Sequence, residues 1–349
     1  MSKLFQLLLF PFALLYDLVT SIRNKFFDLG VKKITHFADT RVVSIGNLTV
    51  GGTGKTPITE YLIQYISDQG LNPAAVLSRG YGRQTKGFRK AQDNSLPEEI
   101  GDEPFQIFRK YSELIDVYVG EKRVPAISQM LDLRKYSVII LDDAYQHRYA
   151  GRNLNVLLSD FNRPFYTDFV LPLGRLRERR AGAKRADAVI VTKCPAQLSD
   201  HDQRNIQQAI YRYTSQQVPV FFSRVDYGRA EQFFGGISNQ DLNVGDKIVI
   251  VTGIAQHAPF VRYLGSRYQV VEQIHFPDHH KYTSKDVEHI RGRLKNGLKD
   301  IKMVTTEKDM VKMASLDWKD LSIFYVPIRI SFLNENLFHS FLHQKLVLN

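Results

Sequence analysis

The chain has 349 residues, enough for one large domain and a smaller second one, and its 44% hydrophobic and 11% aromatic residues exclude extended disorder. Its formal net charge of +11 favours an anionic partner, which charge alone leaves open between nucleic acid, an anionic membrane and a phosphorylated substrate. The single cysteine, Cys194, excludes an intramolecular disulfide and a paired-cysteine metal site, so a reducing compartment is the simpler assumption.

The N-terminal segment is apolar but fits neither a membrane span nor a secretory signal. Its uninterrupted apolar run, residues 7–16, contains Pro11 and is only ten residues long, whereas a spanning helix needs about 20 residues. Asp17 follows the run, where a secretory signal would have a small-residue cleavage site. We therefore predict an amphipathic helix over residues 1–28 that lies in the headgroup layer of a membrane. A helix packed onto the protein core is the alternative.

Strands and helices alternate through the first two-thirds of the chain. Apolar runs bounded by turn residues predict strands, and a period near 3.6 residues predicts a helix after the first of them. The predicted strands cover residues 41–47, 73–78, 138–143, 154–159 and 186–193, and the helix covers residues 56–69. This alternation predicts the α/β class, with a mostly parallel sheet flanked by helices.

A second series of strands begins later in the chain. Residues 218–225 have the pattern of an extended connection, and further strands are predicted at 247–254, 269–276 and 301–306. We therefore expect three parts, which are the N-terminal helix over 1–28, a large domain over 29–222 and a smaller α/β domain over 223–349. The smaller domain is expected to close a cleft that holds the functional site.

A glycine-rich segment follows the first predicted strand and leads into the helix, which is the context of a phosphate-binding loop, or P-loop. Its glycines let backbone N–H groups turn toward phosphate oxygens, Lys55 reaches the β- and γ-phosphates, and the Thr56 hydroxyl can ligate Mg²⁺. At the first position of the motif Thr49 replaces the usual glycine, so Gly51 must supply the turn. The predicted ATP-binding residues are Thr49, Val50, Gly51, Gly52, Thr53, Gly54, Lys55 and Thr56. The large domain is thus predicted to be P-loop NTPase-like.

Two adjacent carboxylates end the strand predicted at residues 138–143. Asp142 and Asp143 are placed to hold Mg²⁺ directly or through water, and the sequence leaves open which of them contacts the ion. Solvated acids at a strand end are the alternative. Deviant P-loop ATPases carry a lysine directly before the paired glycines, and Val50 stands at that position here.

A set of unusual segments occurs in one order along nearly the whole chain. They are SIGNLTVGGTGKTP (44–57), LSRGYGR (77–83), GDEP (101–104), LDDAYQHR (141–148), LPLGRLRE (171–178), VTK (191–193), TGI (252–254), FPDHHKY (276–282) and TTEKD (305–309). In these segments and in its apolar N-terminal helix, the chain resembles the tetraacyldisaccharide 4'-kinase family. The family usually has glycine and phenylalanine where this chain has Ala144 and Tyr145, and Ala144 makes a positive φ at that position less comfortable.

The resemblance implies an activity, a substrate and a location. Family members transfer the γ-phosphate of ATP, with Mg²⁺, to the 4'-hydroxyl of tetraacyldisaccharide 1-phosphate, the lipid A disaccharide precursor, and so form lipid IVA. The implied partners are this anionic glycolipid and the inner-membrane surface, and not nucleic acid. The protein is expected at the cytoplasmic face of the bacterial inner membrane as a peripheral (monotopic) protein.

Four residues are implied to bind the substrate. Arg79 and Arg83 flank a Gly-Tyr-Gly turn, and Arg177 and Glu178 lie in a basic segment that follows a Pro-Leu-Gly turn. Arginine suits an anionic glycolipid because its guanidinium group binds phosphate oxygens in pairs. Solvated turn arginines and a surface charge run are the alternatives.

Proton transfer from the 4'-hydroxyl is assigned by the resemblance to Asp102, with His279 as its partner and Lys55 as the third catalytic residue. A helix N-cap is the alternative for Asp102, and a satisfied loop histidine is the alternative for His279, which adjoins His280. A tetrahedral metal site at these histidines is disfavoured, because no further cysteine or clustered histidine completes it.

Two other functions stay open. A non-catalytic nucleotide switch would use ATP binding only to control attachment to a membrane or a protein, and would show slow hydrolysis without an acceptor. A nucleic-acid ATPase is favoured by the charge alone, and no recognisable nucleic-acid module accompanies that charge.

Overall fold

The structure is a computed structural model that describes residues 3–215, 217–234, 241–278, 280–295, 301–314, 316–318 and 321–347. The chain divides into two compact units. The first unit joins Met1–Val225 to Ile330–Asn349, and the second is Asp226–Arg329. The smaller domain expected over 223–349 is therefore wrong at its C-terminal end, because residues 330–349 belong to the first unit.

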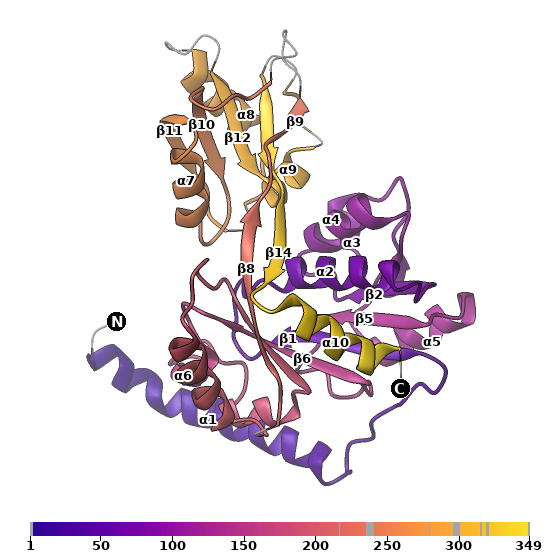
Figure 1. Ribbon diagram of the computed structural model, residues 1–349. Coiled ribbons are helices and arrows are strands. Elements are labelled where there is room, and N and C mark those ends of the chain that lie inside the picture. Colours follow the sequence, from indigo (N-terminus) through magenta and orange to yellow (C-terminus); the bar gives the residue numbers. More distant parts are fainter. Residues whose placement is uncertain are drawn as a thin grey trace. The chain divides into compact units, whose positions relative to one another are not determined.

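The first unit is built on a sheet of nine strands in the order β14-β8-β7-β6-β1-β5-β2-β4-β3. Figure 1 shows strands β1, β2, β5, β6, β8 and β14 of this sheet. All neighbouring pairs from β8 to β4 are parallel, and β3 is antiparallel to its neighbour β4. The mostly parallel sheet predicted from the sequence is thus confirmed. The strands are β1 (Arg41–Asn47), β2 (Ala74–Ser78), β3 (Arg89–Lys90), β4 (Asp116–Val119), β5 (Val138–Asp142), β6 (Leu154–Asp160), β7 (Ala188–Thr192), β8 (Val220–Tyr227) and β14 (Ile328–Phe332).

The helix after β1 covers this sheet with its apolar face. In the helix after β1, Ile58, Leu62 and Ile66 recur every four residues and are fully buried, and this helix contacts β1 and β5. The helices of the first unit are α1 (Lys3–Asp28), α2 (Lys55–Asp68), α3 (Pro97–Ile100), α4 (Asp102–Tyr111), α5 (Arg123–Leu133), α6 (Asp200–Tyr211) and α10 (Glu335–Leu346), with 3₁₀ turns η1 (Phe165–Thr167) and η2 (Arg180–Arg185).

The C-terminal segment packs against α2 through aromatic rings. The ring of Tyr61 on α2 lies 5.0 Å from Phe332 and 5.8 Å from Phe338, and Phe338 is fully buried. The Tyr61 hydroxyl also donates to Glu335 at 2.7 Å. These contacts bury apolar area that α10 could not bury alone, which explains why the chain returns to the first unit.

Segment 218–225 was expected to be an extended connection, but most of it is a strand of the sheet. Residues from Val220 onward form β8, whose Val220–Phe222 pair with Val189–Val191 of β7. The short run was ambiguous because a fully buried strand shows no period-2 alternation.

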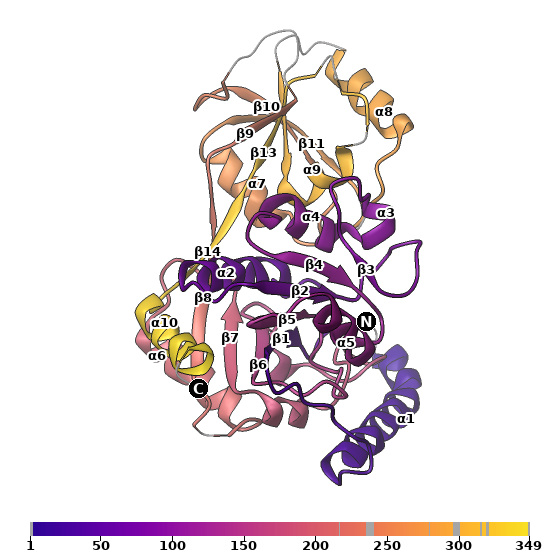
Figure 2. The same cartoon turned by 90° about the vertical axis from the view of Figure 1, so that its right-hand side faces the viewer.

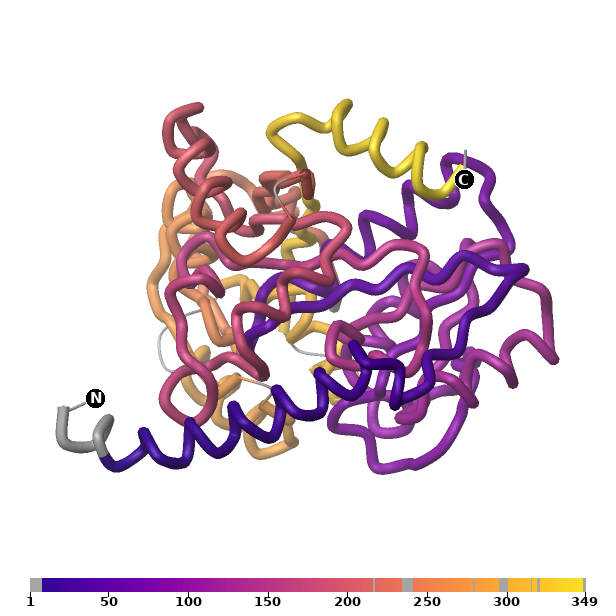
Figure 3. The backbone as a smooth tube through the Cα atoms, turned by 90° about the horizontal axis from the view of Figure 1, so that it is seen from below, coloured from indigo at the N-terminus to yellow at the C-terminus, as the bar shows by residue number. Residues whose placement is uncertain are grey.

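α1 runs along the surface of the first unit as one long helix (Figure 3). Leu15 and Leu18 are 60% and 52% exposed, and more than half of the exposed large hydrophobic side chains of the described residues lie within residues 8–31. None of the helices among the described residues combines the length and the hydropathy that crossing a bilayer demands.

The second unit has a sheet of five strands in the order β11-β10-β12-β13-β9. The first four run parallel, so their carboxyl ends share one edge, and β9 is antiparallel to β13. Figure 2 shows strands β9, β10, β11 and β13 of this sheet. The elements are β9 (Glu231–Phe234), β10 (Lys247–Thr252), α7 (Ala258–Gly265), β11 (Gln269–His275), α8 (Ser284–Lys295), β12 (Lys302–Thr306), α9 (Glu307–Met313) and β13 (Ile323–Val326).

The end of β1 approaches the segment after β5 very closely. A Cβ atom added at Gly46 would lie 2.7 Å from the Tyr145 Cβ and 2.8 Å from the Tyr145 amide nitrogen. Glycine is therefore required at this position by the neighbouring backbone, immediately before the P-loop.

We expect Gly46→Ala to destabilise the first unit by about 1–3 kcal/mol, because main-chain atoms must move to admit the methyl group. The measurement is chemical denaturation followed by circular dichroism. Gly292→Ala is the control, because Gly292 is an exposed residue of α8 and no heavy atom lies within 4 Å of the place its new methyl group would take. That control should be neutral or slightly stabilising, and a Gly46→Ala protein as stable as wild type would contradict the close approach.

Candidate functional site

The P-loop connects β1 to α2. Gly51 and Gly54 have φ values of 106° and 83°, so the turn depends on these two glycines, as expected for Gly51. Position 49 does not have to be glycine, because Thr49 lies in extended chain and forms an antiparallel bridge with Leu176. The Val50 N–H donates to the Arg175 carbonyl at 2.8 Å, so a neighbouring loop holds the first half of the P-loop.

Side chains from three strands fix the rest of the loop. The Asn47 amide donates to the Thr53 hydroxyl at 2.7 Å, and the Thr192 hydroxyl donates to the Thr53 carbonyl at 2.8 Å. The Lys193 ammonium group donates to the Gly52 carbonyl and also pairs with Asp160. Sequence reasoning missed these bracing residues, although polar residues at the ends of adjacent parallel strands were a signal for them.

Asp142 is the last residue of β5, which lies next to β1 in the sheet, and Asp143 follows it. The Lys55 Nζ lies 3.8 Å from Asp143 Oδ1, and the Arg177 guanidinium group donates to the same oxygen at 2.8 Å. The positive φ falls on Asp143, at 47°, so Ala144 is free of the strain expected for it. The structure therefore brings together four predicted residues, Lys55, Asp142, Asp143 and Arg177.

The two carboxylates have opposite electrostatic environments. Burial, reinforced by the negative charges of Glu103 and Asp143, raises the pKa of Asp142 to about 7. Burial also opposes ionisation of Asp143, but Lys55 and Arg177 outweigh it and lower the pKa of that carboxyl. Asp143 is therefore paired with two cations. Asp142 is only 1% exposed, and neighbouring cations offset its negative charge less fully.

A buried arginine that the sequence did not single out lies beside Asp142. Arg123, the first residue of α5, is 2% exposed and donates to the backbone carbonyls of Asp142 and Gly120. Burial, together with the positive charge of the exposed Arg79, lowers the pKa of Arg123 to about 10, although Asp142 and Asp143 oppose this shift. No sequence motif marks Arg123, and only the structure shows that it lies beside Asp142.

Asp102 is the first residue of α4, and its N-cap alternative is wrong. The cap position is Gly101, with a φ of 95°, and the helix begins at Asp102 itself. The adjacent Glu103 raises the pKa of Asp142 by its charge, so the start of α4 lies near the end of β5. Asp102 is half-buried.

The remaining predicted substrate residues lie in different environments. Arg79 is exposed, whereas the Arg83 side chain is 2% exposed and is held by Glu121 and the Gly87 carbonyl. Glu178 is also buried, at 2% exposure. Arg83 and Glu178 thus contact neighbouring protein groups.

In the second unit, His279 lies outside the described residues. His280 is held by its own loop, because its Nε2 lies 3.2 Å from Asp286 and its ring stacks on Phe276 with centroids 4.4 Å apart. At the same sheet edge Asp309 is fully buried and accepts from the Gly253 N–H at 2.9 Å. The segments TGI and TTEKD therefore meet in this unit.

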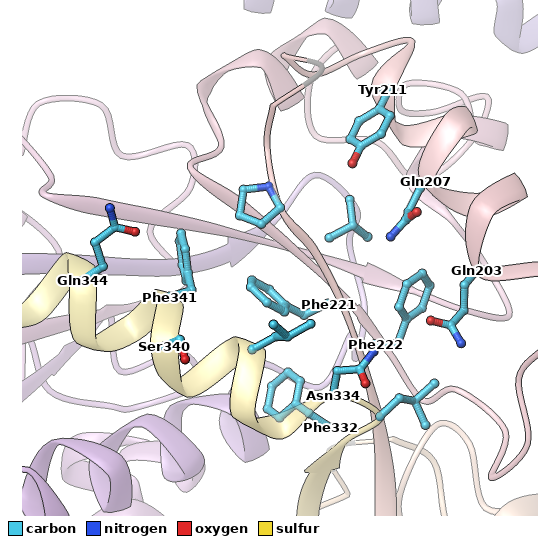
Figure 4. Close-up of a pocket in the computed structure, with 14 residues that line it drawn as sticks. Gln203, Gln207, Tyr211, Phe221, Phe222, Phe332, Asn334, Ser340, Phe341 and Gln344 are labelled. Carbon is cyan, nitrogen blue, oxygen red and sulfur yellow. The ribbon is translucent and has the colours of Figure 1, made fainter. Parts of the chain in front are cut away.

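A cavity of about 470 Å³ lies between α6, β8 and α10, on the first unit (Figure 4). Aromatic side chains and glutamines line it, including Gln203, Gln207, Phe221, Phe222, Phe332 and Phe341. Among the residues that the structure describes, no charged side chain and no P-loop residue lines this cavity, so it does not fit a polyphosphate.

Comparison with known proteins identifies the family. Residues 5–347 match the family model of LpxK, Tetraacyldisaccharide-1-P 4'-kinase. A tetraacyldisaccharide 4'-kinase from Cytophaga hutchinsonii is 42% identical over 331 residues, covering 93% of this chain and 91% of the relative. A tetraacyldisaccharide 4'-kinase from Flavobacterium johnsoniae is 43% identical over 339 residues, covering 95% of this chain and 94% of the relative.

A solved structure has the same fold. The crystal structure of LpxK from Aquifex aeolicus, an "apo" form in complex with ATP, superimposes with a TM-score of 0.76 and 25% identity, covering 98% of this chain and 99% of that one. The fold class predicted from the sequence is confirmed by this match, and the resemblance is confirmed by the family model and the relatives. The chain belongs to the tetraacyldisaccharide-1-P 4'-kinase family, and it is a phosphotransferase.

Proposed function

We propose that this protein transfers the γ-phosphate of ATP to the 4'-hydroxyl of tetraacyldisaccharide 1-phosphate, the family reaction in lipid A biosynthesis. The observation that carries the proposal is the meeting of Lys55 and Arg177 at Asp143, beside a P-loop and a second, uncompensated carboxylate. Phosphoryl transfer needs cations around the transferred group and little covalent chemistry from the protein. This site supplies such cations.

The P-loop residues would bind ATP. Backbone N–H groups of the part of the loop that leads into α2 would surround the β- and γ-phosphates, and α2 would direct its N-terminus at them. Lys55 and Arg177 then follow the negative charge that develops on the transferred phosphoryl group. The LpxK structure from Aquifex aeolicus in complex with ATP supports this assignment.

The donor set fits Mg²⁺, the ion that the fold implies. Thr56, Asp142 and Asp143 would hold it, because a buried carboxylate whose pKa is raised to about 7 by burial and neighbouring negative charges is stabilised by a cation. Among the described residues, no cluster of three or more His, Cys, Asp or Glu side chains could hold a metal ion by itself. When bound, Mg²⁺ neutralises and orients the β- and γ-phosphates.

Asp102 is proposed to accept the proton of the 4'-hydroxyl, and its position at the start of α4, near the end of β5, supports this role. His279 is proposed as its partner, on the family resemblance alone. Arg79 is proposed to bind the anionic glycolipid, because it is exposed beside the Gly80–Gly82 turn.

The apolar surface of α1 supports a proposed position on the cytoplasmic face of the inner membrane. Phe12, Leu15 and Leu18 are each more than half exposed, and a contiguous apolar patch on a helix that does not span fits the headgroup layer. An acylated acceptor lies in the same layer, so this helix brings the enzyme to its substrate.

The proposed reaction is tested with γ-labelled ATP, Mg²⁺ and the disaccharide 1-phosphate in mixed micelles. Wild type should transfer the label to lipid, and Lys55→Ala should lower kcat by about 10²–10³-fold, because charge that develops in the transition state loses its support. Lys135→Ala, which changes an exposed lysine beyond α5, is the control. ATP hydrolysis without any labelled lipid would instead support a nucleotide switch.

A second experiment tests the membrane assignment. The double variant Leu15→Glu/Leu18→Glu should bind anionic vesicles at least about 100-fold more weakly, because each leucine contributes roughly 1.5–3 kcal/mol and each added charge is repelled. Leu133→Glu, at a 64% exposed position of α5, is the matched control. Equal vesicle binding by wild type and the double variant would show that α1 is only a packed structural helix.

A further inference from the structure

The polar side of α1 is bonded to one loop of the first unit. The Tyr16 hydroxyl donates to the Arg177 carbonyl at 2.9 Å, the Asn24 amide donates to Glu178 at 2.6 Å, and Arg179 pairs with Asp17 at 2.6 Å. Three consecutive residues of the loop are therefore each held by the helix. The apolar residues of α1 remain exposed on its other side.

Glu178 is the centre of this junction. Its Oε1 accepts from Arg185 at 2.7 Å and from the Gln146 amide at 3.1 Å, while its Oε2 accepts from Asn24. The residue is 2% exposed, so its carboxylate is occupied by three protein groups. A buried carboxylate satisfied in this way fixes the positions of its partners.

The same junction reaches the P-loop. The Gln146 amide that bonds Glu178 also donates to the Asn47 carbonyl at 2.8 Å, at the residue where β1 ends. The Gln146 carbonyl in turn accepts from Arg23 of α1. Two residues of α1, Arg23 and Asn24, are thus linked to the start of the P-loop through one glutamine and one glutamate.

The loop held by α1 also places a cation of the site. The Arg177 N–H donates to the Leu48 carbonyl at 2.7 Å, and its guanidinium group donates to Asp143 at 2.8 Å. Arg177 is therefore fixed on one side by the P-loop and on the other by Tyr16. A shift of α1 would move this arginine relative to Asp143.

We propose that Glu178 is a positioning residue that couples α1 to the P-loop and to Arg177, so that the docked N-terminal helix sets the geometry of the phosphoryl-transfer site. The inference rests on the proposed function. It deepens that function by giving the helix a second role, because the surface that meets lipid and the bonds that hold the site belong to one rigid element. A misplacement of about 1 Å can lower a rate about 100-fold, so modest displacement matters.

Asn24→Ala tests the coupling, because it removes one partner of Glu178 and leaves the exposed apolar residues of α1 unchanged. We expect kcat to fall about tenfold and the Kd for a non-hydrolysable Mg²⁺–ATP analogue to rise severalfold. Binding to anionic phospholipid vesicles should stay at the wild-type level. Lys25→Ala, at the position one residue later, is the control and should change neither kcat nor the Kd for the ATP analogue.

Tyr16→Phe provides a second variant that removes only the hydroxyl bonded to Arg177, and it should lower kcat in the same sense by a smaller factor. Asn24→Ala and Gln146→Ala should be non-additive, with the double variant close to the more impaired single variant, because both interrupt one chain of bonds. Multiplicative losses would overturn the coupling.

The outcomes separate this inference from the proposed function. If wild type forms no phosphorylated lipid, the proposed function fails, and the coupling is still tested by the Kd for the ATP analogue. If wild type is active while Asn24→Ala keeps both the wild-type kcat and Kd, the coupling fails. A kcat that falls only in proportion to vesicle binding would also overturn it, since α1 would then act only as an anchor.

Discussion

The structure of the site depends on negative charge that is buried where β1 and β5 end side by side. Asp142 and Asp143 come from one strand end, and Glu103 adds its charge from the start of α4. Lys55 and Arg177 neutralise Asp143, whereas Asp142 stays under-compensated. Isolated buried charge is unfavourable, so the surrounding elements are constrained to bring cations to this point.

That constraint explains why distant segments converge on the P-loop. The loop after η1 supplies Arg177 and pairs its backbone with Thr49 and Val50. At the ends of β6 and β7, Lys193, paired with Asp160, braces Gly52, and Thr192 braces Thr53. α1 also contacts the loop after η1, through two hydrogen bonds and an ion pair at residues 177–179. The helix that is proposed to meet the membrane therefore also supports the site, which is the basis of the proposed coupling between α1 and phosphoryl transfer.

Periodicity and local motifs predicted much of the fold and part of the site. Strand β1 was predicted with the bounds observed, and the P-loop, Asp142 and Asp143 were found because their chemistry follows strand ends. Tertiary context decided the rest. The return of α10 to the first unit depends on ring packing against Tyr61, and the burial of Arg83 and Glu178 depends on partners far away in sequence. No motif marked Arg123, which is buried. A helix N-cap was the alternative for Asp102, but the structure has Gly101 at that position.

Burial and the charges of Glu103 and Asp143 favour the protonated form of Asp142 in the nucleotide-free protein. Its folded-state pKa of about 7 lies above the ordinary value of about 4, so its ionisation lowers stability as the pH rises from about 4 through 7. The direct measurement is a carbon-13 titration of labelled aspartate carboxyls in the protein without nucleotide. One carboxyl should titrate near pH 7 and be missing from Asp142→Asn. A spectrum in which every aspartate carboxyl titrates near pH 4 or below would contradict the raised pKa of Asp142.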